Sequence, residues 1–349
     1  MKILISDITS CKSIIIARFI KKNYNSLIYS FDYRKKSKFF HTKYVDHHYV
    51  INKNNYIDEI IEIIEKNKID LFLPTNNNNL EIILKNFNGK PYFNFYGSFE
   101  SFDLLNDKSK LYLIAEKLQI QQPEKFNNIH EAKIPFIIKP KKLSSSKGVK
   151  YILNEAHREK VLSEIENSDD YVIQQYIKGN GVGYSGFSKE GNIQMGYGHK
   201  RIIEYPITGG GSVFRESFYN DEIKEVSEKL LKYTSWSGFF MFEFKLSDDN
   251  QIYLIESNPR IWGGINQGLV NNINYFEPLL GKIDLPPHKK MIRTYFSPLI
   301  YFSFFHYIIN LKLAPVFKFI LHFNSNKPDV SFFNDPLGWV SLFLKYEKN

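Results

Sequence analysis

The chain has a single cysteine, Cys11, which excludes an intrachain disulfide framework and fits a reducing compartment. Long apolar runs are also missing. The longest, near 296–310, contains Pro298 and His306 and is too short and too interrupted to span a membrane. In the amino-terminal MKILISD, Asp7 interrupts the apolar run before it is long enough to be the core of a signal peptide. We therefore expect a cytoplasmic protein without a transmembrane segment.

Concentrated charge and the common nucleotide fingerprints are absent as well. The 46 basic and 37 acidic residues give a net charge of +9, but the basic residues are scattered among Asn and Ile. A general Lys, Asn and Ile bias explains this charge better than nucleic-acid binding, so no nucleic-acid partner is expected. No G-x-G-x-x-G follows the first apolar segment, and no P-loop motif occurs, which argues against both classes of site.

The first hundred residues alternate short apolar segments with helical periodicity. Residues 2–6 and 27–31 are expected as strands, and Ile57, Ile60, Ile61 and Ile64 form a helical stripe. This order predicts a parallel sheet covered by helices. Ligands collect at the carboxyl ends of such strands. The loops 7–10 and 75–77 are therefore candidate pocket residues, with plain connecting loops as the alternative.

The most informative stretch is GFFMFEFKLSDDNQIYLIESNPR, beginning at Gly238. Two aromatic and β-branched runs around an Asp-Asp-Asn sequence predict a β-hairpin. A turn at 249–250 or a loop over 248–251 gives the same register. That register places Glu243 opposite Glu256 and Met241 opposite Asn258.

Directly opposed carboxylates repel each other unless something positive lies between them. A hard cation such as Mg²⁺ or Mn²⁺, bound by Glu243, Glu256 and Asn258, would remove that conflict. The alternatives are two solvated glutamates on an open sheet face, or a bulge that separates them. Arg260 follows Asn258 closely in the sequence. A guanidinium beside a metal site is suited to binding phosphate or carboxylate oxygens.

EFK at Glu243 to Lys245 and ESNPR at Glu256 to Arg260 resemble the metal-binding strands of the ATP-grasp superfamily. The resemblance covers roughly residues 99–280. It implies ATP as cofactor, with a pair of Mg²⁺ (or Mn²⁺) ions held by Glu243, Glu256 and Asn258. It also implies that Arg260 steadies a reacting carboxylate or acyl phosphate.

Earlier segments agree with the family order. Lys108, at the start of a predicted helix, must either extend into solvent or meet an anion. The polar KKLSSSKG that follows Lys139 is either a flexible hairpin tip or a phosphate-binding loop, and it is similar to the family's glycine-rich flap. The strand YVIQQYI matches the family hinge that reads adenine, with a buried edge strand as the alternative. The ATP contacts that the resemblance implies are Lys108, Lys139, Ser144, Ser145, Ser146, Lys147, Gly148, Gln174, Gln175, Tyr176, Ile177 and Lys245.

A second informative stretch is YGHKRIIEYPITGGGS, residues 197–212. Adjacent basic residues alternate across a strand, so at least one of them points into whatever that face lines. The glycines allow close backbone approach to a ligand. A solvated basic strand with a loose loop is the alternative, but the run is similar to a signature of the carbamoyl-phosphate-synthase-like carboxylate–amine ligases. The resemblance implies Arg260, Lys200 and Arg201 as catalytic residues and His199, Glu204, Gly209, Gly210 and Ser212 as substrate contacts.

These observations predict an α/β and α+β protein. We expect a Rossmann-like parallel-sheet domain at 1–98, an ATP-grasp domain at 99–285 with its flap near 110–175, and a helical C-terminal appendage at 286–349. The family implies a ligase that joins a carboxylate to an amine through an acyl phosphate, and the resemblance suggests surface-polysaccharide or peptide-like metabolite biosynthesis as its pathway. A kinase, a carboxylase-like enzyme and a nucleotide-binding regulator are the alternatives, and a homodimer is compatible with the family.

Overall fold

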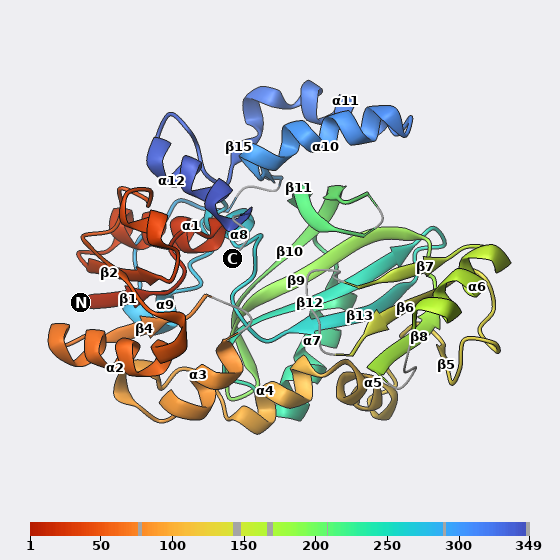
Figure 1. Cartoon of the computed structure of the whole chain (residues 1–349), viewed down its shortest axis with the longest axis horizontal. Helices are drawn as coiled ribbons and strands as arrows, with labels where there is room; N and C mark the ends of the chain where they lie inside the picture. The colour runs from red at the N-terminus through yellow and green to blue at the C-terminus, as the bar shows by residue number, and fades with distance from the viewer. Residues whose placement is uncertain (76–78, 142–147, 166–169, 208, 289–290, 347–349) are drawn as a thin grey trace.

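The computed structural model describes residues 1–75, 79–141, 148–165, 170–207, 209–288 and 291–346. Its described part contains a parallel N-terminal sheet, a small antiparallel sheet and a large sheet. Figure 1 shows the N-terminal domain on the left and the small sheet on the right, with the large sheet running between them. The predicted fold class is confirmed by this arrangement. No described helix is long and apolar enough to cross a bilayer.

The N-terminal sheet is entirely parallel in the order β3-β2-β1-β4. Its strands are β1 (Lys2–Ile5), β2 (Leu27–Asp32), β3 (His47–Val50) and β4 (Leu71–Leu73), and its helices are α1 (Cys11–Asn23), α2 (Tyr56–Asn67) and α3 (Leu80–Phe87). The side chain of Ser10 caps α1 by accepting a hydrogen bond from the N–H of Ser13. Ile14, Ile15 and Ile16 are fully buried, so α1 is held by the sheet it covers.

Two helices, α4 (Phe99–Asn106) and α5 (Lys108–Lys117), lead from this domain to the small sheet. Asp107 caps α5 by accepting from the N–H groups of Ser109 and Lys110. The small sheet has the order β5-β8-β6-β7. Its elements are β5 (Lys125–Phe126), β6 (Phe136–Pro140), β7 (Lys150–Ile152), α6 (Glu155–Glu164) and β8 (Tyr171–Gln175).

The large sheet has the order β13-β12-β9-β10-β11-β14-β15. Its strands are β9 (Gly179–Lys189), β10 (Asn192–Tyr205), β11 (Gly211–Ser217), β12 (Gly238–Ser247), β13 (Ile252–Asn258), β14 (Arg293–Tyr295) and β15 (Lys327–Pro328). The helices α7 (Asp221–Thr234), α8 (Asn266–Leu269) and α9 (Glu277–Leu280) connect its strands. The sheet passes between the other two domains, so residues along it can face both (Figure 1).

The hairpin β12–β13 brings the predicted glutamates face to face by an unexpected route. Ser247 pairs with Gln251 across a three-residue connection in which Asn250 has a left-handed φ of 63°. The register then shifts between Glu243 and Phe244, which makes Ile255 an extra residue in β13. The connection moves the pairing by one residue and the bulge moves it back. Glu243 therefore lies opposite Glu256, as predicted.

The C-terminal segment is more than the helical appendage that the sequence suggested. Strands β14 and β15 extend the large sheet beyond β11. Helices α10 (Ser297–Ile309) and α11 (Ala314–Leu321) pack on that extension, and α12 (Pro336–Ser341) follows. The domain boundary at residue 285 stays a prediction, because residues on both sides of it contribute strands to one sheet.

Candidate active site

Two pockets meet at the opposed glutamates of the β12–β13 hairpin. The first, about 430 Å³, lies between the small and large sheets, and we call it the hinge pocket because residues 174–177 line it. The second, about 350 Å³, is lined by Arg215 and Arg260, and we call it the arginine pocket. Glu243, Glu256 and Arg201 line both. A group bound in one pocket can therefore reach a group bound in the other.

Lysine side chains from three elements surround the hinge pocket. Lys108 comes from the start of α5, Lys139 from β6 and Lys245 from β12. The ammonium of Lys139 is buried and donates to the carbonyl of Ile255, the bulge residue, at 3.0 Å. Burial lowers the pKa of Lys139 to about 8, with Lys108 adding to the effect and Glu256 opposing it. Burial also lowers the pKa of Lys245. These cations suit a polyanion such as a triphosphate.

The hinge end of this pocket offers amide groups. Gln174 is buried, and its Nε2 has no hydrogen-bond partner among the described residues. The backbone N–H groups of Gln175 and Tyr176 already donate to Glu124 and Pro135. Of the two backbone groups of Gln175, only the carbonyl is therefore left for the predicted contact with adenine. The buried amide of Gln174 is a polar group that a heterocyclic base would satisfy.

The arginine pocket is built from distant parts of the chain. His199 and Arg201 come from β10, Arg215 from β11 and Arg260 from the segment after β13. Ser212 also lines the pocket, and its buried hydroxyl has no partner among the described residues. The remaining wall includes Thr9, Ser10, Cys11 and Lys12 at the start of α1 and Phe296, Leu299, Asp329 and Leu342 from the C-terminal segment.

Charges at the junction are paired in a chain. Arg201 forms an ion pair with Glu243 and lies 3.6 Å from Glu204. Arg260 donates to the Oδ1 of Asn258 at 2.5 Å, and Asn258 donates to Glu243 at 3.5 Å. Burial, reinforced by the charge of Glu243, raises the pKa of Glu256. The junction therefore disfavours its full negative charge unless a further cation is present.

Glu243, Glu256 and Asn258 could hold a hard divalent cation, because they offer carboxylate and amide oxygens on neighbouring strands. Two opposed carboxylates, one of them with a raised pKa, would be relieved by such an ion. Among the described residues no cluster of three or more acidic, His or Cys side chains could hold a metal on its own. Mg²⁺ is usually bound by one or two carboxylates together with phosphates and water, and Glu243 and Glu256 would supply the carboxylates here.

The structure places several of the predicted site residues differently from the prediction. Lys200 lines neither pocket, because alternate residues of a strand point to opposite faces and both His199 and Arg201 face the arginine pocket. Its predicted catalytic role is therefore corrected, and Arg201 alone of the two occupies the site. Glu204 and Gly209 line the hinge pocket and not the arginine pocket where substrate contacts were expected.

The flap is described only in part. Ser144, Ser145, Ser146 and Lys147 lie outside the described residues. Gly148, with a positive φ of 73°, lies just before β7 and lines neither pocket. A phosphate-binding role for this loop stays a prediction. Gly210 and Ser212 line the arginine pocket, where the sequence placed them.

Sequence reasoning missed the buried pair of Arg215 and Asp329. Their side chains are 1% exposed, and their closest atoms are 2.5 Å apart. Arg215 lies in a short strand and Asp329 follows β15, so no local spacing links them. The pair fixes the C-terminal segment against the pocket, because breaking it would leave a buried charge without a partner.

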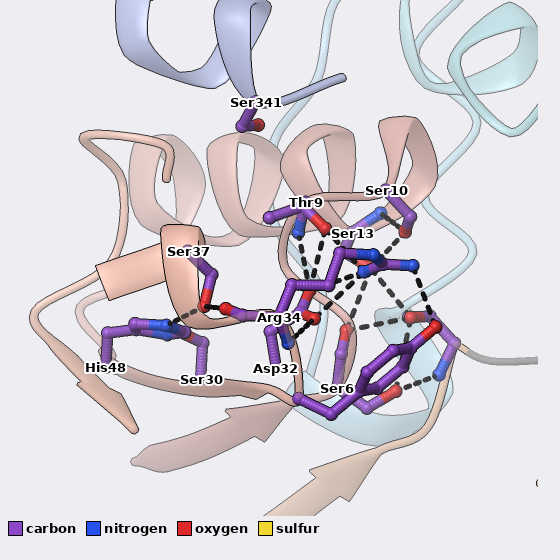
Figure 2. Close-up of polar contacts among 12 residues, drawn as sticks. Ser6, Thr9, Ser10, Ser13, Ser30, Asp32, Arg34, Ser37, His48 and Ser341 are labelled. Atoms are coloured by element: carbon purple, nitrogen blue, oxygen red, sulfur yellow. Dashed lines mark hydrogen bonds and ion pairs between the residues drawn. The ribbon is translucent and has the colours of Figure 1, made fainter. Parts of the chain in front are cut away.

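A polar network behind the pocket fixes the loop that precedes α1 (Figure 2). Thr9 donates through its hydroxyl to the carboxylate of Asp32 at 2.7 Å, and Arg34 pairs with the same carboxylate at 2.8 Å. Thr9 and Ser10 line the arginine pocket. Thr75, from the other predicted loop, is buried in hydrogen bonds with Ser6 and does not line it. Residues 76–77 lie outside the described residues.

His199 should make the protein sensitive to acid. It is buried, and burial with the charges of Arg201 and Arg215 lowers its pKa to about 3. The unfolded chain binds this proton nearer pH 6.5, so acidification below about pH 6.5 favours unfolding. At about pH 5 the cost is about 2 kcal/mol.

His199→Gln should therefore lose less free energy of unfolding than the parent between about pH 7.5 and about pH 5. Urea unfolding at both pH values measures the difference. His157→Gln, on the exposed face of α6, serves as the control and should behave as the parent does. If His199→Gln and the parent lose the same free energy of unfolding on acidification, His199 is not responsible for the acid sensitivity.

Comparison with known proteins identifies a domain within the chain. Residues 105–264 match the ATP-grasp domain. The biotin carboxylase domain of a 2-oxoglutarate carboxylase from Hydrogenobacter thermophilus has a TM-score of 0.68 at 13% identity, covering 84% of this chain and 73% of that one. An L-amino acid ligase from Bacillus licheniformis has a TM-score of 0.59 at 16% identity, covering 80% of this chain and 73% of that one.

A curated relative, an isoleucine–tRNA ligase from Methanocaldococcus jannaschii, is 25% identical over 149 residues, or 40% of this chain. This chain spans only 14% of that protein. Both of these similar structures are below 25% identity, so they show the fold alone. Residues 105–264 of the chain are therefore an ATP-grasp domain.

Proposed function

We propose that the chain is an ATP-dependent ligase that joins a carboxylate to an amine and releases ADP and phosphate. The observation that carries this proposal is the meeting of the two cationic pockets at Glu243 and Glu256. A nucleotide in one pocket and a carboxylate in the other would bring their reacting groups together at this junction. Because ATP is the substrate, we also place the protein in the cytoplasm.

The hinge pocket supports ATP binding. The side-chain amide of Gln174 faces the end where a base would lie, and Lys108, Lys139 and Lys245 supply positive charge for the phosphates. Mg²⁺ held by Glu243, Glu256 and Asn258, as one ion or a pair, would neutralise charge on the phosphate oxygens. Glu243, Glu256 and Asn258 lie on two paired strands of the large sheet, which would position these groups before the nucleotide arrives.

The arginine pocket supports carboxylate binding. Arg260 and Arg201 face its centre, and each guanidinium can grip a carboxylate through two hydrogen bonds. In the reaction the carboxylate oxygen forms a bond to the γ-phosphorus and ADP leaves. The amine nitrogen then bonds to the acyl carbon, phosphate leaves and the nitrogen loses a proton. Arg201 would exchange its pairing with Glu243 for the incoming substrate.

Water must be kept from the acyl phosphate, and the C-terminal segment contributes to that. Phe296, Leu299 and Leu342 line the arginine pocket, together with the buried ring of Trp262. An apolar wall on one side of a cationic pocket lowers the local dielectric and strengthens the charge interactions at the junction. This is a further reason to favour chemistry through a labile intermediate.

We expect ADP and phosphate to accumulate only when both a carboxylic acid and an amine are present. The measurement is phosphate release with Mg²⁺-ATP across matched panels of carboxylates and amines, with nucleotide products separated by chromatography. AMP and pyrophosphate as products would exclude the acyl-phosphate route. ADP formed with bicarbonate alone would favour a carboxylase-like enzyme, and a phosphorylated product without amine would favour a kinase. Tight ATP binding without turnover on any panel would favour a regulator.

A further inference from the structure

Helix α10 is apolar on both of its faces. Ile300, Ser303 and Tyr307 are buried against the large sheet, as expected for one face of a helix. Phe302, Phe305 and Ile309 occupy the opposite face and are exposed. A helix that is apolar all round normally has protein or lipid on every side. The outward face of α10 therefore lacks a partner among the described residues.

The exposed apolar surface continues past the end of α10. Leu311, in the connection, is 84% exposed, and Leu321, at the end of α11, is 79% exposed. We call the surface formed by Phe302, Phe305, Ile309, Leu311, Leu321 and Phe323 the apolar hairpin face. Figure 1 shows α10 and α11 side by side at the edge of the molecule, beyond β11. Contiguous apolar surface of this kind marks an interaction site.

The charge around this face distinguishes between its possible occupants. The sequence from residue 285 to residue 328 contains no Asp or Glu. It contains Lys312 and Lys327, both exposed, and Lys312 directly follows Leu311 of the apolar hairpin face. A second copy docked on the same face would bring the same positive charges to the rim, where they would repel. An anionic lipid surface would attract them.

We propose that the apolar hairpin face docks on an anionic membrane surface. Helices α10 and α11 are 13 and 8 residues long, whereas a spanning helix needs about 20. They would lie in the plane of the surface, with aromatic and leucine side chains among the acyl chains and lysines toward the headgroups. The six residues of the apolar hairpin face line neither pocket, so the ligase proposal does not depend on this placement, although Lys312 beside the face also lines the hinge pocket.

Vesicle flotation of the full chain tests this proposal. The protein should float with vesicles that contain phosphatidylglycerol. Its affinity for phosphatidylcholine vesicles should be lower by about tenfold or more. The triple variant Phe302→Ser, Phe305→Ser, Leu311→Ser should bind the anionic vesicles at least about a hundredfold more weakly. Its melting temperature should match the parent's, because all three side chains are exposed.

The matched control is the double variant Phe39→Ser, Leu113→Ser, which removes exposed apolar side chains elsewhere. It should float as the parent does. The proposal is overturned if the parent stays in solution with both kinds of vesicle, or if the triple variant floats like the parent. Light scattering provides a further check. A parent dimer that becomes monomeric in the triple variant would assign the face to a second copy.

Discussion

Glu243→Gln and Glu256→Gln should both abolish turnover, but they should shift the melting temperature in different directions. Loss of a single preorganised group that stabilises developing charge costs about 10²–10³-fold in rate, and we expect at least that from either change. The stabilities differ because the two carboxylates have different partners. Glu243 pairs with Arg201, whereas burial and the charge of Glu243 raise the pKa of Glu256, so ionised Glu256 is destabilised.

The neutral amide of Glu256→Gln relieves the repulsion from Glu243, which is worth roughly a few tenths to 1 kcal/mol. That variant should melt at or slightly above the parent without metal or nucleotide. Glu243→Gln instead removes the closest partner of Arg201 and leaves Glu204 at 3.6 Å. A poorly paired buried donor costs about 1–3 kcal/mol, so this variant should melt lower.

Thermal melts with and without Mg²⁺-ATP, together with phosphate release, measure both effects. The parent should gain stability from Mg²⁺-ATP, and both variants should lose most of that gain. Glu81→Gln, which changes an exposed pair on α3, is the control for charge removal alone. Melting of Glu256→Gln far below the parent would mean that Glu256 makes structural hydrogen bonds. Parental turnover in either variant would remove this hairpin from the metal site.

The paired glutamates show what the sequence could predict. The aromatic strands and the turn residues predicted the hairpin, but its connection is one residue different from the predicted turn. Glu243 lies opposite Glu256 because the bulge compensates for that difference. The bulge at Ile255 was not predicted, because a single extra residue leaves no compositional sign. It matters nonetheless, since the bulge residue's carbonyl accepts the hydrogen bond from Lys139. The existence of the hairpin could be read from local sequence, whereas the bulge that completes its register and the contact between two sheets could not.

The arginine pocket shows where sequence reasoning failed. Lys200 and Arg201 looked equivalent in the run HKR, and only the orientation of β10 separated them. Arg215 and Asp329 are more than a hundred residues apart in the sequence, and they meet because β14 pairs with both β11 and β15. The C-terminal segment lacked a clear pattern because its helices carry apolar residues on both faces. Local patterns thus located the metal strands, but the walls of the substrate pocket came from nonlocal contacts.

Lys139→Met should weaken ATP binding and remove its dependence on pH. The ammonium of Lys139 is held inside the hinge pocket, where a phosphate would gain a charge-assisted hydrogen bond worth about 1.5–3 kcal/mol. Its loss corresponds to about a tenfold to hundredfold weaker affinity near neutral pH. Methionine keeps the length and apolar stem of the side chain, so the buried volume is nearly preserved.

The pH dependence follows from the lowered pKa of about 8, which burial imposes on Lys139. In the free protein the ammonium is charged below that pH and neutral above it, and ATP favours the charged form. ATP affinity in the parent should therefore fall as pH rises through about 8, by up to about tenfold per unit. Calorimetry at several pH values measures this slope, which should be absent in Lys139→Met.

Lys150→Met is the matched control for this experiment. Lys150 lies on β7 of the same sheet and pairs with Glu164 outside the hinge pocket. It should keep both the parental affinity and the parental pH slope, because the ammonium it removes does not face the nucleotide. Equal ATP affinity in Lys139→Met and the parent at neutral pH would mean that the phosphates bind elsewhere. A parental slope retained in Lys139→Met would instead assign the titration to another group of the pocket, such as Lys245, whose pKa burial also lowers.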